Sequence, residues 1–178
     1  TLFRSKTFII NTQVTSDMGD ELASLGKLIT RMKLNTLKLR IKGTHKDVNY
    51  QFPKMLNLLK CTSAKNMKLI VEPEQSKTVI ETSNNSLLCQ NLRLFNQIIE
   101  YLAHLKSFEL KYNFLSMKEF CKNRYINFLR LSALKSLESL SLDFIDEDHS
   151  QNNAIVFGRL INEISFLTQL RNLSLTVK

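Results

Sequence analysis

The chain has 178 residues, of which 43% are hydrophobic and 23% charged, with 25 Lys and Arg against 16 Asp and Glu. This length and composition are ordinary for one soluble globular domain with a proper core. Four glycines and two prolines are too few to form the many tight turns of a β-barrel or β-sandwich, and no apolar stretch is long enough for a membrane-spanning helix.

Five segments of the chain share one pattern, an apolar residue, two further residues and then three apolar positions in alternation. The segments are 34–41, 64–71, 105–112, 137–144 and 170–177. Their alternating part is typical of a strand with one buried face. Their second apolar positions are Leu37, Met67, Phe108, Leu140 and Leu173, and Phe8 marks a weaker first copy. The steps between these positions are 29, 30, 41, 32 and 33 residues, which predicts a repeat architecture.

Amphipathic helices are predicted between the strands, because apolar residues recur at three- and four-residue steps over 18–32, 88–102 and 157–167. Acidic residues at 20 and 21 favour the start of the first helix. Asn85 or Ser86 precedes the third, and residues 116–119 form a capping box. A further helix is expected around Pro53, with this proline in its first turn. The long step of 41 residues predicts a loop insertion over 73–86.

Helices that alternate with strands through short links predict parallel strands, because each crossover returns the chain to the same end of the sheet. A doubly wound sheet with helices on both faces needs strands that are apolar almost throughout. Here the alternate positions are polar or charged, which favours a sheet with one face in water. These outward residues are Lys38, Arg40, Lys68, Glu109, Lys111, Ser141, Asp143, Ser174 and Thr176.

The repeated segments resemble the leucine-rich-repeat family, closest to its long-repeat, ribonuclease-inhibitor-like type with a full helix in each repeat. The resemblance covers most of the chain. It implies a single domain over residues 1–178, an α/β solenoid of about five to six repeats with a parallel sheet on the concave face and helices on the convex face. The family's usual Asn or Cys, three residues after the third anchor leucine, is matched only by Asn113. Since the chain begins at Thr1, we expect it to be part of a longer protein.

Positive charge is concentrated in residues 27–68, where eleven basic residues face only Asp47. In the expected fold Lys38, Arg40 and Lys68 share the open face, with Lys111 further along. Such a patch attracts acidic protein surfaces, nucleic acid or anionic lipid. The patch is rich in Lys and no aromatic residue alternates with its charges on the strands, so for nucleic acid it supports only phosphate attraction without sequence readout.

The residue pattern predicts no catalytic, metal or cofactor site. The scattered glycines cannot form a phosphate-binding loop, and His45, His104 and His149 lie far apart without a cysteine at ligand spacing. Asp143 and residues 146–148 are expected to form a solvated acidic rim. The three cysteines, at 61, 89 and 121, are expected to be reduced thiols of an intracellular protein, cytoplasmic or nuclear.

The sequence therefore predicts a non-catalytic protein–protein interaction or scaffold module, or a subunit of a larger complex, without a small-molecule substrate. The nine outward residues named above are the predicted partner-binding set, and an acidic protein surface is the favoured partner. The alternative is an RNA- or DNA-associated protein that uses the basic segment 27–68.

Overall fold

The computed structural model of the chain describes residues 7–15, 18–60, 62–73, 94–116, 130–145 and 152–177. Its strands are β1 (Thr7–Gln13), β2 (Thr36–Gly43), β3 (Asn66–Pro73), β4 (Ser107–Ser116), β5 (Ser139–Ile145) and β6 (Asn172–Val177). Its helices with both ends described are α1 (Gly19–Arg31), α2 (His45–Leu59) and α5 (Asn152–Ser165), with the short 3-10 turns η1 (Glu100–Leu102) and η2 (Leu131–Ala133). Residues 94–99 are helical and lead into η1.

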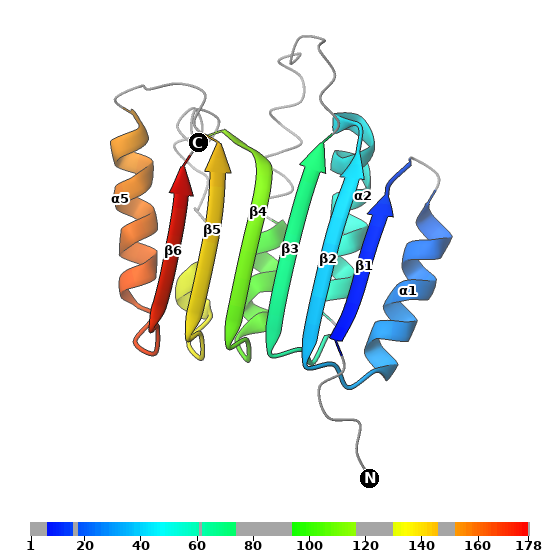
Figure 1. Ribbon diagram of the computed structural model, residues 1–178, viewed down its shortest axis with the longest axis horizontal. Helices are drawn as coiled ribbons and strands as arrows, with labels where there is room; N and C mark the ends of the chain where they lie inside the picture. The colour runs from blue at the N-terminus through cyan, green and yellow to red at the C-terminus, as the bar shows by residue number, and fades with distance from the viewer. Residues whose placement is uncertain are drawn as a thin grey trace.

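All six strands belong to one parallel sheet, in the order β1-β2-β3-β4-β5-β6 (Figure 1). The anchors of the sequence repeat are direct neighbours across this sheet. Their row is Phe8, Leu37, Met67, Phe108, Leu140 and Leu173. The parallel sheet and its register are therefore confirmed, including the weak first copy at Phe8.

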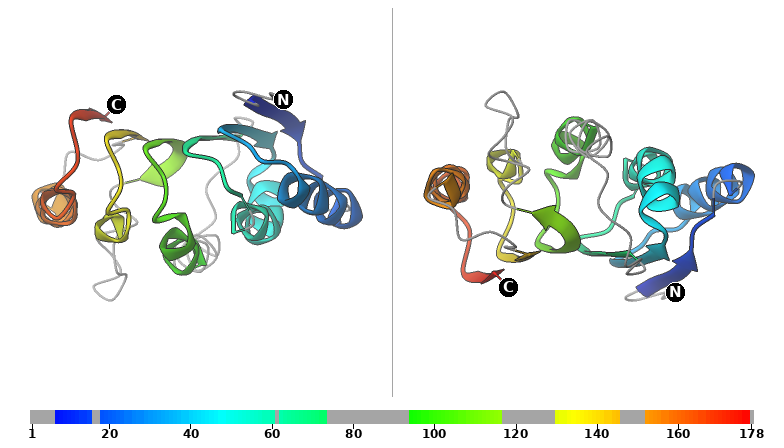
Figure 2. Two further views of the ribbon diagram at one scale, coloured as in Figure 1. Left: turned by 90° about the horizontal axis from the view of Figure 1, so that it is seen from below. Right: turned by 90° about the horizontal axis from the view of Figure 1, so that it is seen from above.

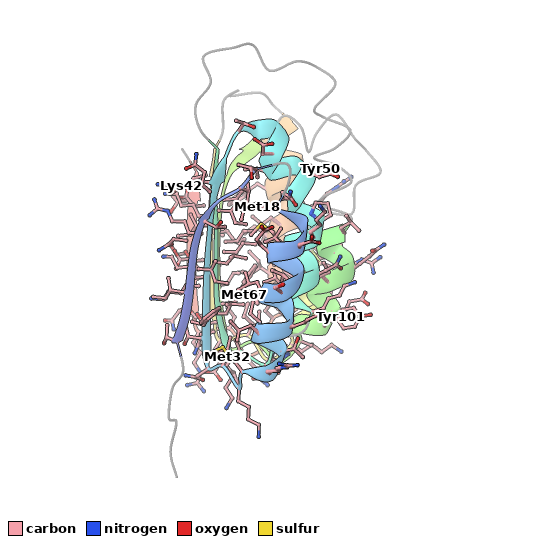
Figure 3. All side chains as sticks on the ribbon, turned by 90° about the vertical axis from the view of Figure 1, so that its right-hand side faces the viewer. Met18, Met32, Lys42, Tyr50, Met67 and Tyr101 are labelled. Atoms are coloured by element: carbon pink, nitrogen blue, oxygen red, sulfur yellow. The ribbon has the colours of Figure 1, made fainter. Side chains whose placement is uncertain are left out.

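One face of the sheet is buried beneath the helices and the other is in water. In β2 the burial alternates, so that Leu37, Leu39 and Ile41 are buried while Lys38 and Arg40 are exposed. Figure 3 shows the helices on one side of the sheet. The side chains of the open side, including the labelled Lys42, point away from the helices. The one-sided arrangement follows from the alternation, because a second helix layer would bury these charges.

The helices pack through apolar residues at helical spacing. Leu22 and Ile29 of α1 are buried, and both belong to the stripe predicted over residues 18–32. Between them, a Cβ added to Gly26 would lie 2.6 Å from the Cδ2 atom of Leu58 in α2. Glycine at this position therefore lets α1 and α2 approach each other closely.

The prediction that Pro53 lies in the first turn of its helix is wrong, because α2 begins at His45 and carries Pro53 in its interior. The helix begins early because Thr44 caps it. The Thr44 hydroxyl oxygen accepts from the Asp47 backbone N–H at 3.2 Å and donates to the Asp47 carboxylate at 2.7 Å. Burial of Val48, Met55 and Leu59 against the core holds the helix on both sides of the proline, which cannot donate a backbone hydrogen bond.

At the amino edge of the sheet, where the strands begin, one backbone carbonyl in each unit accepts two N–H groups from the next unit. The Asn35 carbonyl binds the N–H groups of residues 65 and 66, both at 3.0 Å. The carbonyls of Lys65, Lys106 and Glu138 repeat the arrangement toward β4, β5 and β6, at 2.7 to 3.1 Å. This two-to-one backbone ladder joins neighbouring units, and at its first junction the Asn66 side-chain amide also donates to the Asn35 carbonyl at 3.3 Å.

The views along the strands show how the two layers differ in width (Figure 2). The helices spread further to both sides than the strands do, so that α1 lies outside β1 and α5 lies outside β6.

Side-chain hydrogen bonds also link neighbouring units. The buried Gln51 of α2 donates to the Thr15 carbonyl at 2.7 Å, and Asn96 accepts from the Arg130 backbone N–H at 2.9 Å.

Several predicted features lie outside the described residues. They are the three cysteines, the loop insertion beyond β3, the start of the helix predicted from residue 88, and the capping box beyond Ser116, the last residue of β4.

Candidate functional site

The open face of the sheet, meaning the outward side chains of β1 to β6, is the candidate site. The structure places all nine predicted residues there, in two rows that cross the strands. The first row is Ile9, Lys38, Lys68, Glu109, Ser141 and Ser174. The second row is Asn11, Arg40, Ile70, Lys111, Asp143 and Thr176.

Ion pairs already occupy the middle of this face. The Arg40 guanidinium contacts the Glu72 carboxylate at 2.6 Å, and the Lys111 ammonium lies 3.8 Å from the other oxygen of the same carboxylate. Lys68 pairs with its register neighbour Glu109 at 2.5 Å. Partly exposed pairs of this kind add only about 0 to 1 kcal/mol each to stability. Their main effect is to neutralise charge over β3 and β4.

Lys38 and Lys42 are different, because no carboxylate of the described residues pairs with either of them, and both are exposed. Beside Lys38 in the first row, Ile9 is 56% exposed. Ile70 is a second apolar side chain on this face and is half-buried between Arg40 and Lys111. The β1–β2 end of the open face therefore combines apolar surface with positive charge that no described carboxylate neutralises.

Charge changes sign along the open face. The cations gather on β2, and β1 carries the uncharged Asn11 and Gln13. Each of β3 and β4 carries one outward lysine and one outward glutamate, and β5 carries Asp143. An anionic ligand is therefore attracted to the β1–β2 end rather than to the β5 end.

The nine predicted residues left out several neighbours that complete the surface. Lys42 and Glu72 continue the outward alternation by one step, so extending the same rule along each strand would have found them. Ile9 and Ile70 interrupt the polar alternation, so that pattern does not indicate them, whereas the pairing of the strands puts these two apolar residues on the same face.

A further ion pair lies at the amino edge, where the Lys106 ammonium contacts the Glu138 carboxylate at 2.7 Å. The hydrogen bond and positive charge of Lys106, with a smaller contribution from Arg171, hold the pKa of Glu138 below its ordinary value. The Glu138 backbone carbonyl is also the ladder acceptor for β6, so this residue joins its neighbouring units through both its side chain and its main chain.

The helix layer carries a second surface, formed by two lysine–tyrosine pairs. The Lys54 ammonium lies 4.7 Å from the ring centroid of Tyr50, which is 57% exposed. The Lys60 ammonium lies 5.5 Å from the ring of Tyr101, which is 60% exposed. Figure 3 shows both tyrosines on the helical side, away from the open face. The strand pattern by itself could not indicate this surface.

No group of three or more His, Cys, Asp or Glu side chains in the described part of the chain could hold a metal ion. His104 is exposed between η1 and β4, as expected for a residue at a helix end. None of the described helices has the combination of length and apolar character that crossing a bilayer requires.

Comparisons of the chain with protein-family models, with curated proteins and with solved structures find no match. Its function is therefore inferred from the arrangement of its own residues.

Proposed function

We propose that the chain is a non-catalytic protein-binding module of the leucine-rich-repeat kind, and that its open face binds an acidic segment of a partner protein. The single observation that carries this proposal is the β1–β2 end of that face, where Lys38 and Lys42 have no carboxylate partner among the described residues and lie beside the exposed Ile9. The wider spread of the helices than of the strands supports a curved, solenoid-like stack.

A protein partner fits this surface better than nucleic acid. The ion pairs of Glu72 and Glu109 with their basic neighbours confine the excess positive charge of this face to its β1–β2 end. A phosphate backbone carries negative charge along its whole length, so only part of this face would match it. No aromatic side chain stands at an outward position of the strand residues with described side chains, so nothing there can stack on a base. A peptide with both acidic and apolar residues can instead meet the two lysines and the isoleucine together.

We expect peptides selected from a random displayed library by the wild-type chain to be acidic, and to lose at least about tenfold in affinity for the variant Lys38→Glu/Lys42→Glu. The loss should shrink in high salt, because screening weakens exposed charges. Fluorescence anisotropy with the selected peptides measures both effects.

The matched control is Lys27→Glu/Lys33→Glu, which makes the same change in net charge at exposed positions outside the sheet. Equal losses of affinity in the two variants would indicate that peptide binding depends on net charge alone. Selected peptides that bind the Lys38→Glu/Lys42→Glu variant as tightly as the wild type would place the binding surface elsewhere. Either result contradicts the proposal.

The helix layer favours a second candidate function, binding of single-stranded nucleic acid. Its supporting observation is the pairing of each exposed tyrosine, Tyr50 and Tyr101, with a lysine, since tyrosine faces stack on bases and lysines contact phosphates. This surface lies within the basic segment and its neighbouring helix.

For this candidate we expect a fluorescent oligothymidylate to bind more weakly as salt rises, and Tyr50→Ala/Tyr101→Ala to weaken binding by about tenfold or more. The variant Tyr50→Phe/Tyr101→Phe should retain most of the affinity, because phenylalanine keeps the aromatic face that stacks on a base. Absence of binding at low salt, or alanine variants that bind like the wild type, would reject nucleic acid as a ligand.

A further inference from the structure

The last unit of the described chain exposes apolar side chains that its predecessors bury. In the anchor row, Leu37, Met67, Phe108 and Leu140 are at most 3% exposed, whereas Leu173 of β6 is 47% exposed. Three more exposed apolar residues lie nearby in the sequence. They are Phe157 at 40%, Ile161 at 42% and Phe166 at 59%. An apolar group of this kind at the end of a stack is a surface for association.

The backbone of the same unit also has a free edge. Among the described strands β6 pairs with β5 alone, so one side of β6 offers backbone groups that no described strand meets. The ladder at the amino edge reaches its last described step here, where residues 171 and 172 bind the Glu138 carbonyl at 2.9 and 3.1 Å. By the repeat of that geometry, the Arg171 carbonyl is the next acceptor.

We propose that the outer edge of β6 and α5 is a docking surface for one further strand-and-helix unit of the same kind. Its strand runs parallel to β6, its first two N–H groups bind the Arg171 carbonyl, and its inward apolar residues lie beside Leu173 and Leu175. Its helix covers the exposed face of α5 at Phe157 and Ile161.

The repeated junctions identify this occupant. At four successive junctions one carbonyl receives two adjacent N–H groups, which requires the incoming strand to begin at the same edge and run in the same direction. An antiparallel strand would enter from the opposite edge and leave the Arg171 carbonyl without these donors. A helix alone would cover the apolar side chains but not the backbone edge.

The outward side chains of β6 are compatible with such a neighbour, because Ser174 and Thr176 are exposed and uncharged. A seventh strand therefore meets no buried charge on the open face. The proposal is independent of the partner-binding role of Lys38 and Lys42, which lie at the other end of the sheet.

The test is the 178-residue chain extended at Lys178 by a second copy of residues 146–178, which keeps the 33-residue step of the last repeat. We expect the β6 amides that do not bond to β5 to exchange with deuterium at least about tenfold more slowly, and the thermal unfolding midpoint to rise by about 4 °C or more.

The matched control replaces the two inward leucines of the added strand, the copies of Leu173 and Leu175, by lysine. This control should leave both quantities at the wild-type values. The proposal would be overturned if the extension that keeps both leucines did not slow the exchange of the β6 amides. The proposal would also be overturned if the unextended chain formed concentration-dependent dimers that protect β6 and the extension did not change this protection. A second copy of the chain would then cover the edge.

Discussion

Replacement of Leu69 by alanine is expected to lower the free energy of unfolding by about 3 kcal/mol, a large part of the stability of an ordinary domain. Leu69 is 1% exposed at the centre of β3, between Leu39 and Leu110 in the inward row. Truncation removes buried apolar surface and leaves a cavity beneath the helix layer. Urea denaturation measures the loss as a lower midpoint with an unchanged slope.

The matched control is Lys68→Ala, one residue earlier on the opposite face. It removes the ion pair with Glu109, but both side chains are more than a third exposed, so the change should stay within about 1 kcal/mol. Similar losses for the two substitutions would mean that β3 does not separate a dry face from a wet one. That outcome would contradict both the burial pattern and the choice of the open face as a binding surface.

Gly43→Ala is expected to cost about 2 kcal/mol, because it combines backbone strain with a close contact to Val14. Gly43 ends β2 with a φ of 157°, where L-residues are strained. An added Cβ would lie 2.8 Å from the Val14 carbonyl oxygen and 2.9 Å from its Cγ2 atom. Val14 also donates to the Lys42 carbonyl at 2.7 Å, so the two chain segments cannot separate without losing this bond.

Gly158→Ala is the control with the opposite sign. Gly158 lies inside α5, and a Cβ there would meet nothing within 4 Å. Alanine should therefore stabilise the chain by about 0.5 to 1 kcal/mol through its better helix propensity. If thermal or urea denaturation shows that both substitutions stabilise the protein, the close approach of Val14 to Gly43 is contradicted.

Local pattern was sufficient for much of the sheet. The two-residue alternation in β2 and the apolar anchors every 29 to 41 residues predicted the strands, their parallel order and their wet face. The inward anchors are neighbours in the structure because each strand must place its apolar side on the same core. Pro53 shows the limit of local pattern, since the Thr44 cap and apolar burial extend α2 on both sides of a residue that usually begins a helix.

In β2 to β5 the sequence by itself determined which side chains face water, because alternation along a strand is a property of neighbouring residues. In β6 it did not, since the inward Leu173 is 47% exposed. Only the tertiary structure decided which outward charges neutralise one another. Arg40 and Glu72 are 32 residues apart, and their contact depends on the lateral position of two strands. The same is true of the pairing of Lys60 with Tyr101, the backbone ladder and the edge of β6 that no described strand meets. Each is set by packing between units, whose geometry no single segment contains.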